Sequence, residues 1–309
     1  MDVRQLKYFL RIVELKSFSE ASKHLRIAQP ALGLQVRKLE DELEVKLLER
    51  HARGVTPTSA GLLLYEHADI ILRQVERAKS EVIDIAAEPR GKIAIGLTTT
   101  VSLVLGGQLV ESYHAECPRV ALRVVDGLSE LLIEWVAADR LDIAFTYNTS
   151  VATGLILEPL LIEDLFLVGP PNAPELAGDT VPFEFVTTVP LVLPSKEHII
   201  RTLADDEANR RDRTIDASFE IDSVQTMKEL VERGIAYTIL PYGAVNPEVE
   251  EGRLSAARIV EPELSRTMYL VHSRRRPSSK AFTTLHNLIN RLVQERMADK
   301  TWCWRPVDA

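Results

Sequence analysis

Apolar residues in the first sixty positions recur at helical spacing in three short segments. Residues 3–14 form the first segment, with Leu6, Phe9, Leu10 and Val13 on one side. Segments this short, each with one apolar face, predict a small domain of helices that pack against one another.

The second helix has a clear start. Ser17 and Glu20 stand in the S-x-x-E relation of a capping box, which predicts that the helix begins at the next residue after the serine. Apolar residues three and four apart form its buried face: Phe18, Ala21 and Leu25.

A turn at residues 26–29 leads into a third helix, in which Pro30 suits the first position because its missing N–H costs nothing there. The buried stripe consists of Leu32, Val36, Leu39 and Leu43. The opposite face carries Gly33, Leu34, Arg37 and Lys38. An apolar Leu34 beside Arg37 fits a face that meets base edges and thymine methyl groups. An amphipathic helix with a cationic outer side is the alternative.

A basic segment rich in turn-forming residues follows the third helix. It contains Arg50, His51, Arg53 and Gly54, and then Thr56, Pro57 and Thr58. The two arginines are placed to clamp phosphates as a small wing. Two helices a tight turn apart, followed by such a wing, predict a winged helix-turn-helix, which places its second helix in the major groove of DNA.

Residues 58–87 contain no proline and predict one long helix. Thirty helical residues span roughly 45 Å. A narrow apolar seam on a single helix favours pairing with the same helix of a second chain, and a helix packed on its own domain is the alternative. The seam alternates spacings of four and three: Leu64, Ala68, Ile71, Val75, Ala78, Val82 and Ile85.

Beyond Gly91, short β-rich apolar runs alternate with helical patterns, which predicts an α/β domain with a mainly parallel sheet. The last strand and helix follow a second set of elements and return to the first, so two lobes joined by two crossings are expected. The predicted strands are 92–97, 121–125, 142–147, 165–168, 191–193, 218–221, 237–240 and 268–272, and the predicted helices are 103–116, 129–139, 197–209, 223–233 and 278–297.

Several segments resemble the LysR-type transcriptional regulators: LKYF, SFSEAS, QPAL, VRKLEDELEVKLLER and ARGVTPTSAG. The resemblance follows nearly the whole chain in order and length. It implies an all-α winged helix-turn-helix head (1–58), a long linker and dimerisation helix with its hinge (59–90), and an α/β two-lobed effector domain like the periplasmic binding proteins (91–297). The first lobe should comprise 91–163 and 268–297 and the second 164–267, with a C-terminal tail at 298–309.

The resemblance also implies partners. It predicts a regulator that binds inverted-repeat operator DNA as a dimer or tetramer, responds to a small-molecule effector, and contacts RNA polymerase if it is an activator. The stretches DGLSELLIEWV, EDLFLVGPP, LVLPSKEH, EIDSVQTMKELVERGIAYTILPYGAV and SRTMYLV are similar to the branch that contains nitrogen assimilation control regulators. That similarity implies a role near nitrogen or amino-acid metabolism.

Four positions depart from the family pattern. Gly33 stands where serine is usual, which removes a hydroxyl that can hydrogen-bond a base or phosphate, and Glu44, Leu48 and Pro57 replace a common glycine, phenylalanine and leucine. The expected DNA contacts are Ser17, Ser19, Gln29, Pro30, Ala31, Gly33, Leu34, Arg37, Lys38, Arg50, Arg53 and Thr58.

The chain is acidic overall, with 37 basic and 45 acidic side chains, but residues 1–60 hold 11 basic and 8 acidic ones. A head this weakly basic should bind DNA well only in pairs. No apolar run approaches the roughly 20 residues that span a membrane, and the N-terminus does not resemble a signal peptide. Cys117 and Cys303 fit a reducing cytosol, so we expect a cytoplasmic protein.

A ligand of a two-lobed domain lies at the carboxyl ends of strands, where helix N-termini converge. Three threonines after the first strand precede a helix and suit a carboxylate or other anion. Asp222 and Gln225 have the spacing of a capping box, which is the alternative role of that aspartate. The expected effector contacts are Thr98, Thr99, Thr100, Ser129, Tyr147, Ser195, Lys196, His198 and Asp222.

Motifs for catalysis or metal binding are absent from the sequence. The seven histidines show no H-x-x-x-H or H-E-x-x-H spacing, and there is no G-x-S-x-G, P-loop or G-x-G-x-x-G. We therefore expect no enzyme, no metal and no cofactor. A solute-binding protein or enzyme with an appended helical domain is the alternative to a regulator.

Overall fold

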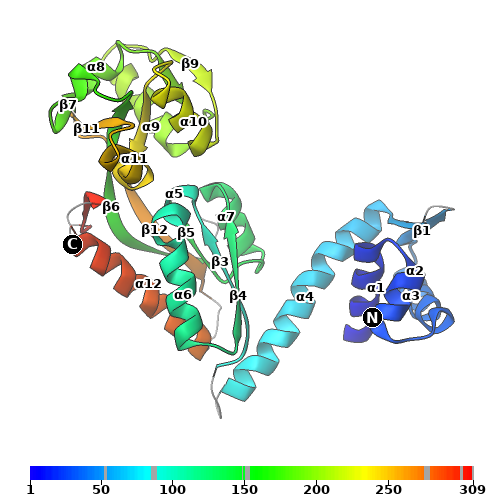
Figure 1. The fold of residues 1–309 in the computed structure, drawn as a ribbon. Coiled ribbons are helices and arrows are strands. Elements are labelled where there is room, and N and C mark those ends of the chain that lie inside the picture. The colour runs from blue at the N-terminus through cyan, green and yellow to red at the C-terminus, as the bar shows by residue number, and fades with distance from the viewer. Residues whose placement is uncertain are drawn as a thin grey trace. The chain divides into compact units, whose positions relative to one another are not determined.

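The computed structural model divides the chain into two compact units, Met1–Gly91 and Lys92–Ala309. Figure 1 shows a small, mainly helical unit that ends in a long helix, and a larger α/β unit. The structure describes residues 1–51, 54–84, 89–147, 149, 154–274, 279–299 and 302–307, and the side chains of these residues except those at 76, 77 and 80–84. Among the described helices, none has the length and apolar character needed to cross a membrane.

The N-terminal unit consists of α1 (Val3–Leu15), α2 (Phe18–Leu25), α3 (Gln29–Leu43), the hairpin β1 (Leu48–His51) and β2 (Gly54–Pro57), and α4 (Ser59–Asp84). The apolar faces predicted for the three short helices meet in one core. Its buried members are Phe9, Ile12, Phe18, Ala21, Leu32, Val36, Leu39, Leu47, Leu48 and Val55.

Helix α2 begins where the sequence predicts. The hydroxyl of Ser17 accepts the amide N–H of Glu20 at 3.3 Å, and the first helical residue is Phe18. The Glu20 carboxylate forms an ion pair with Lys23 at 2.8 Å. The serine cap thus fixes the start of α2, while the glutamate is engaged with the next turn.

Helix α3 begins at Gln29, one residue before the predicted start. Pro30 therefore occupies the second helical position, where its missing N–H still lies outside the intrahelical ladder. Glu44 ends α3 with a left-handed backbone (φ 56°), at the position where the family favours glycine. A side chain is strained in this conformation, because its Cβ crowds the backbone.

The buried carboxylate of Glu40 fastens α3 to the wing. Oε1 accepts the amide N–H groups of Leu47 at 2.9 Å and Leu48 at 3.2 Å, and Oε2 pairs with Lys46 at 2.9 Å. Burial alone would raise the pKa of this carboxyl, but the hydrogen bonds outweigh it and hold the pKa below its usual value. Glu40 therefore determines where strand β1 can start.

The linker helix α4 packs partly on its own chain. Ala68 is fully buried against Leu6 and Leu10 of α1, with Leu64 and Ile71 packed beside them. The alternative of a helix packed on its own domain is therefore correct for the first half of the predicted seam. Ala68 in particular has no surface left for a second chain.

The second half of the seam is described only in part. The side chain of Val75 is half-buried and that of Ala78 is exposed. The side chain of Val82 and the whole of Ile85 lie outside the described residues. Pairing of this half with a second chain stays a prediction.

The C-terminal unit is built on two long antiparallel strands, β6 (Leu155–Gly169) and β12 (Ser265–Ser273), which run between its two lobes in Figure 1. The other strands are β3 (Gly91–Leu97), β4 (Val120–Asp126), β5 (Ile143–Thr146), β7 (Thr180–Pro182), β8 (Leu191–Leu193), β9 (Ala217–Glu220), β10 (Thr238–Pro241), β11 (Ser255–Val260) and β13 (Trp304–Arg305).

The helices of this unit are α5 (Thr99–Val101), the π-helix η1 (Ser102–Gly106), α6 (Gly107–Glu116), α7 (Ser129–Ala137), the 3₁₀ turn η2 (Pro174–Leu176), α8 (Phe183–Val186), α9 (Ile199–Arg210), α10 (Val224–Glu232), the 3₁₀ turn η3 (Tyr242–Ala244), α11 (Asn246–Glu250) and α12 (Lys280–Ala298).

The expectation of a mainly parallel sheet is wrong. Some strands pair in parallel: β3 with β5, β7 with β11, and β8 with β9. Others pair antiparallel: β12 pairs with β5 and β6, and β6 pairs with β10 and β11. The cause is that β6 carries the chain into the second lobe and β12 carries it back. The sequence predicted only residues 165–168 of β6, because most positions at 156–160 are half-buried and carry no continuous apolar run.

The strand order shows how each lobe uses these two strands. The main sheet runs β4-β3-β5-β12-β6-β11-β7, with β10 and β13 also paired to β6. Both predicted lobe boundaries, 163/164 and 267/268, fall inside the paired strands. The crossing between the lobes is therefore a rigid two-stranded ribbon rather than a pair of loops.

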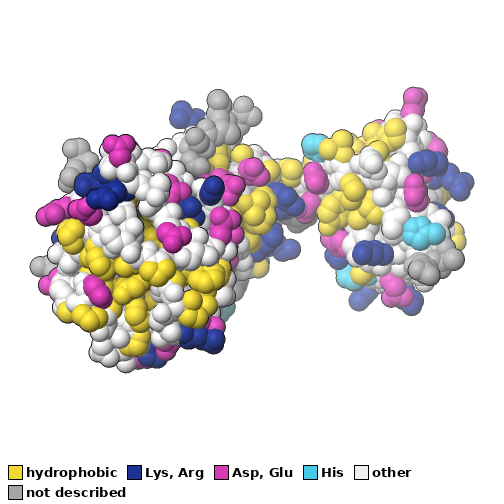
Figure 2. Space-filling model, turned by 90° about the horizontal axis from the view of Figure 1, so that it is seen from above, with side chains coloured by type: hydrophobic (Ala, Val, Ile, Leu, Met, Phe, Trp, Pro, Cys, Tyr) yellow, Lys and Arg dark blue, Asp and Glu magenta, His cyan; other side chains and the backbone are white. Residues whose placement is uncertain are grey.

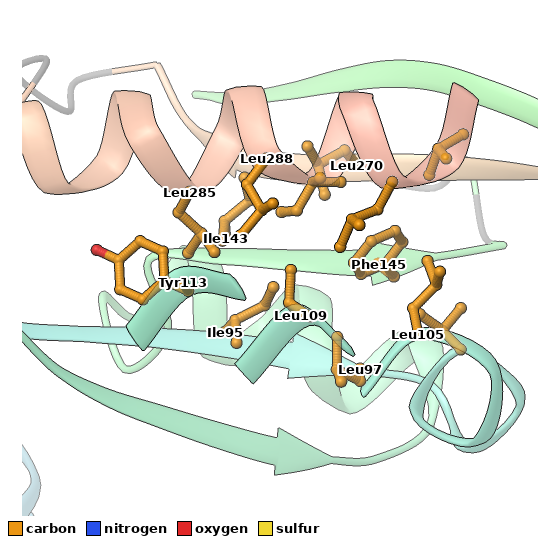
Figure 3. Packing of buried hydrophobic residues seen from close by; sticks show 14 of the residues in the cluster. Ile95, Leu97, Leu105, Leu109, Tyr113, Ile143, Phe145, Leu270, Leu285 and Leu288 are labelled. Atoms are coloured by element: carbon orange, nitrogen blue, oxygen red, sulfur yellow. The ribbon is translucent and has the colours of Figure 1, made fainter. Parts of the chain in front are cut away.

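Helix α12 covers one face of the first lobe. Figure 3 shows Leu285 and Leu288 of α12 projecting toward Phe145 and the other buried residues of the sheet. Tyr113 of α6 is fully buried in the same cluster, and its hydroxyl donates to the carbonyl of Ala281 at 3.0 Å. This contact joins the start of α12 to α6.

We expect Glu40→Ala to destabilise the N-terminal unit by about 2 kcal/mol, because a charged acceptor is removed from two buried amides. Hydrogen exchange at the amides of Leu47 and Leu48 in the full-length protein should become faster. Asp41→Ala, which changes an exposed residue on the same helix, should leave the exchange as it is. Equal exchange in wild type and the Glu40 variant would show that the carboxylate does not fasten the wing.

Candidate DNA-binding surface and ligand cleft

The outer side of α3 and the first strand of the wing form a shallow surface on the N-terminal unit. Leu34 is 51% exposed, and Arg37 and Lys38 are exposed beside it. The face that the helical phase predicted is therefore presented to solvent. The surface is lined by Phe18, Gln29, Pro30, Gly33, Leu34, Arg37 and Arg50.

An aromatic ring holds Arg50 over this surface. Its guanidinium carbon lies 4.1 Å from the centroid of the Phe18 ring, a cation–π contact that orients the charge. A Cβ at Gly33 would lie 3.6 Å from Nη2 of Arg50, which is ordinary van der Waals contact. A serine at position 33 would therefore fit without moving the arginine.

Some predicted DNA contacts also have structural roles. The hydroxyl of Thr58 donates to the carbonyl of Lys46 at 2.7 Å and accepts the amide of Gly61 at 3.0 Å, so it holds the start of α4 beside the wing. Ser17 caps α2, as described above. Ser19 and Ala31 are exposed, and Arg53 lies outside the described residues.

Charges of both signs are mixed on the face of the molecule seen in Figure 2. On the N-terminal unit, lysines and arginines alternate with acidic side chains and form no continuous basic field in this view. The small net charge of residues 1–60 also predicts that phosphate attraction comes from individual side chains such as Arg50.

The C-terminal unit has a cleft between its lobes, with Arg266 of β12 in its lining. The first lobe contributes Thr98, Thr99, Thr100, Gly127, Leu128, Ser129, Glu130 and Tyr147. The second contributes Pro194, His198, Ile199, Ile200, Asp222, Val224, Met227 and Leu240.

Seven of the nine predicted effector residues line this cleft: Thr98, Thr99, Thr100, Ser129, Tyr147, His198 and Asp222. The other two are not among its lining residues. The side chain of Lys196 is exposed, and the amide N–H of Ser195 donates to Oδ1 of Asp222 at 2.9 Å. The loop after β8 is thus tied to the loop after β9 at the cleft, which the position of these residues after a strand does not reveal.

The capping role considered for Asp222 is wrong. Helix α10 is capped by Ser223, whose hydroxyl accepts the amide of Thr226 at 3.3 Å. Asp222 instead accepts the amide of Ser195, and this hydrogen bond holds the pKa of its carboxyl below the usual value. The aspartate is an ionised group that ties together two loops of the second lobe.

A helix N-terminus faces the cleft from the first lobe. Thr98 precedes α5, which continues through the π-helix η1 into α6, so one helical run begins at the cleft. Thr98 and Thr100 are buried, and Thr99 donates to Asp126 at 3.0 Å. Free N–H groups and the helix dipole favour an anion at this position, and π-helical turns are frequent at functional sites.

Arg266 is the arginine in the cleft lining, and sequence reasoning did not predict it. It is 5% exposed, its Nε donates to Oε2 of Glu163 at 2.8 Å, and its guanidinium lies 3.6 Å from the centroid of the Tyr147 ring. Burial alone would lower the pKa of Arg266, but Tyr147 and Glu163 outweigh it and raise the pKa, so the side chain stays cationic. No local pattern marks this arginine, the second residue of β12, as buried.

The carboxylate of Glu163 gathers several donors around this arginine. It accepts the hydroxyl of Tyr147 at 3.0 Å and, on Oε1, the indole N–H of Trp304 at 3.1 Å. Burial raises the pKa of Tyr147 well above its usual range, so its hydroxyl remains a donor. Arg305 donates to the neighbouring Asp164 at 3.0 Å. The C-terminal tail therefore docks at the crossing between the lobes.

His198 is a neutral histidine in the second-lobe wall. Its Nδ1 accepts the amide of Ile200 at 3.2 Å, so the neutral ring carries its proton on Nε2. Burial and, to a smaller extent, the charge of Arg266 lower the pKa of His198 to about 4, against the weaker opposing effect of Asp222. The histidine therefore offers a neutral hydrogen-bond donor at physiological pH.

Two family models match the chain. One, described as bacterial regulatory helix-turn-helix protein of the lysR family, matches residues 3–62, and the other, the LysR substrate binding domain, matches residues 86–294. The chain belongs to the LysR family. It is therefore a transcriptional regulator rather than an enzyme, and the alternative of a solute-binding protein or enzyme with an appended helical domain is wrong.

Curated relatives of this LysR-family chain include two nitrogen assimilation regulatory proteins called nac. The one from Klebsiella aerogenes is 34% identical and covers 95% of both chains. The one from Escherichia coli strain K12 is 35% identical and covers 87% of this chain and 88% of its own. A solved structure of full-length CbnR complexed with its target DNA has a TM-score of 0.71 at 19% identity, over 94% of this chain and 99% of that one, and shows the same fold.

We expect the stability of the C-terminal unit to fall in acid because of His198. The unfolded chain takes up the proton near pH 6.5, but the folded protein takes it up only near pH 4, so stability is lost as the pH falls between these values. Between pH 7 and 5 this amounts to about 2 kcal/mol. Denaturant unfolding, followed by the fluorescence of the three tryptophans of this unit, measures the loss.

His198→Asn is the matched variant, because asparagine also caps a helix but does not titrate. Between pH 7 and 5 this variant should lose about 2 kcal/mol less stability than wild type. His114→Ala, which changes an exposed histidine, should show the wild-type loss. A His198 variant with the wild-type pH dependence would show that His198 is not held neutral by its surroundings.

Proposed function

We propose that this regulator binds inverted-repeat operator DNA as a dimer, and that an anionic metabolite in the cleft modulates the binding. The observation that carries the first part is the exposed face of α3, on which apolar Leu34 lies beside Arg37. A leucine meets thymine methyl groups and an arginine binds guanine bidentately. Arg50, held over Phe18, reaches a phosphate, and Arg53 of the wing is expected to reach another.

We expect two N-terminal units to bind DNA together, because each carries only a small net positive charge and because the linker helix can pair with that of a second chain. On α4, the seam residues Val75 and Ala78 are half-buried and exposed, respectively. They offer a second chain a contact on one side of the helix. A two-fold pair of heads binds two half-sites in inverted orientation. A tetramer that also pairs effector domains is the larger assembly we expect from the family.

The ligand proposed for the cleft is a small carboxylate or similar anion. The N-terminus of the helical run at Thr99 and the hydroxyls of Thr100 and Ser129 provide donors. The cationic Arg266 and the neutral donor His198 stand on the other sides of the cleft.

The physiological setting is proposed from the relatives. Both nac proteins carry the name nitrogen assimilation regulatory protein, and their similarity extends over most of this chain. A role in nitrogen or amino-acid metabolism, in the cytoplasm, follows as the proposal. RNA polymerase is a further partner if the protein is an activator.

We expect Arg37→Ala and Leu34→Ala to change sequence preference at single positions of the half-site, by roughly tenfold or more in relative affinity. Affinity selection on a randomised inverted repeat, with wild type and variants compared, measures this preference. Arg11→Ala removes the same charge from α1, where Arg11 pairs with Glu14, and should not change the preferred bases. Wild-type preference in both α3 variants would show that this face does not read DNA.

We expect Thr100→Val to weaken stabilisation by an anionic metabolite, because it removes one buried hydroxyl from the cleft while keeping the shape of the side chain. A thermal-shift screen of small carboxylates on wild type identifies the ligand, since a ligand of the folded state raises the midpoint. Thr214→Val, which makes the same change at an exposed position, should respond as wild type. An equal response of both variants would place the ligand elsewhere.

A further inference from the structure

Two histidines and a glutamate meet on one face of the first lobe, and none of them is among the residues that line the cleft. Nε2 of His272 lies 2.7 Å from Oε1 of Glu158, and Nε2 of His286 lies 2.7 Å from Oε2 of the same carboxylate. The three side chains place one nitrogen or oxygen each within 4.8 Å of the others.

The topology brings these residues together from three elements. Glu158 of β6 lies opposite Leu270 of β12, so His272, two residues further along β12, is its diagonal neighbour on the same face of the sheet. Helix α12 covers this face and contributes His286. In the sequence, 114 residues separate Glu158 from His272, which is why no motif spacing revealed the cluster.

The surroundings hold both imidazole rings in place. The Phe282 ring lies one turn before His286 on α12, with its centroid 5.4 Å from that of His272 and 6.0 Å from that of His286. Nδ1 of His272 lies 3.4 Å from the carbonyl of Ser273, and Nδ1 of His286 lies 3.3 Å from the amide nitrogen of Asn290. Each ring thus has a polar neighbour behind it.

The cluster is enclosed on one side and open on the other. The side chain of His272 is 11% exposed, that of His286 is 25% exposed, and that of Glu158 is 35% exposed. Solvent therefore reaches the carboxylate while the rings pack against the lobe. An ion can enter from solvent, and a water molecule can remain bound to it on the open side.

We propose that Glu158, His272 and His286 bind a divalent transition-metal ion such as zinc, with a fourth position open to water. Two imidazole nitrogens and one carboxylate oxygen form a known type of three-ligand zinc site. On binding, each neutral ring coordinates the ion through Nε2 and carries its one proton on Nδ1, a position that the proton reaches by exchange with water. The Ser273 carbonyl, 3.4 Å from Nδ1 of His272, accepts that proton from His272.

A bound ion would cross-link β6, β12 and α12. These are the two strands that form the crossing between the lobes and the helix that covers the first lobe. Metal binding would therefore raise the stability of the first lobe, because the ligands come together only in the folded chain. This inference is independent of the proposed operator and effector.

The test uses full-length protein without a histidine tag, titrated with Co²⁺ as a visible probe and then with Zn²⁺. One Co²⁺ per chain should give the visible absorption of a low-coordinate site, and Zn²⁺ should displace it. Zn²⁺ should also raise the midpoint of thermal unfolding, and EDTA should reverse the rise. Absence of the absorption in wild-type protein at millimolar Co²⁺ would overturn the proposal.

Two variants separate metal binding from a hydrogen-bonded cluster. His286→Gln keeps an N–H donor for Glu158 but loses a nitrogen ligand, so its Co²⁺ affinity should fall at least tenfold. His114→Ala, which removes an exposed histidine of α6, should bind as wild type does. Circular dichroism establishes that the His286 variant is folded, and Glu158→Gln gives a second test because an amide is a poor ligand. Wild-type affinity in a folded Gln variant at either position would overturn the proposal.

Discussion

The buried ion pair between Glu163 and Arg266 is the constraint on which the cleft depends. The two residues are 1% and 5% exposed and lie on β6 and β12, where these strands cross between the lobes. Leaving one charge of such a pair unpartnered costs about 3–5 kcal/mol. The pair must therefore be surrounded by donors, and Tyr147 and Trp304 supply them. One wall of the cleft and the docking site of the tail are both fixed by this requirement.

The same pair limits what the cleft can bind. An anion that enters the cleft meets a guanidinium whose charge Glu163 already offsets, so Arg266 alone cannot hold it tightly. Nε and Nη2 of Arg266 lie 2.8 Å and 2.7 Å from Oε2 of Glu163, so both nitrogens face that carboxylate rather than a ligand. The helix N-terminus at Thr99 must provide the remaining attraction. Charge and backbone donors thus act on the ligand from different elements.

The fold of the N-terminal unit could be predicted from local sequence patterns. Much of the effector domain could not, because it depends on contacts between residues distant in the sequence. The start of α2 at Ser17 and the exposed face with Leu34 follow from relations three and four residues apart. The threonines of the cleft were also found, because they follow a strand and precede a helix. The mixed sheet was missed because it depends on the continuity of β6, and Arg266 because its burial is set by Glu163, 103 residues earlier.

The N-terminal unit is built from residues close in the sequence, whereas the cleft is built from residues distant in the sequence. The proposed DNA-reading surface is formed by side chains of α2, α3 and β1, which share one core, so the N-terminal unit can keep this surface whatever happens in the cleft. The cleft rests on β6 and β12, which also carry the tail through Trp304 and Arg305. A ligand that moves either strand must move these contacts together. The response to a ligand is therefore best sought in how the C-terminal units arrange the heads, not in the shape of each head.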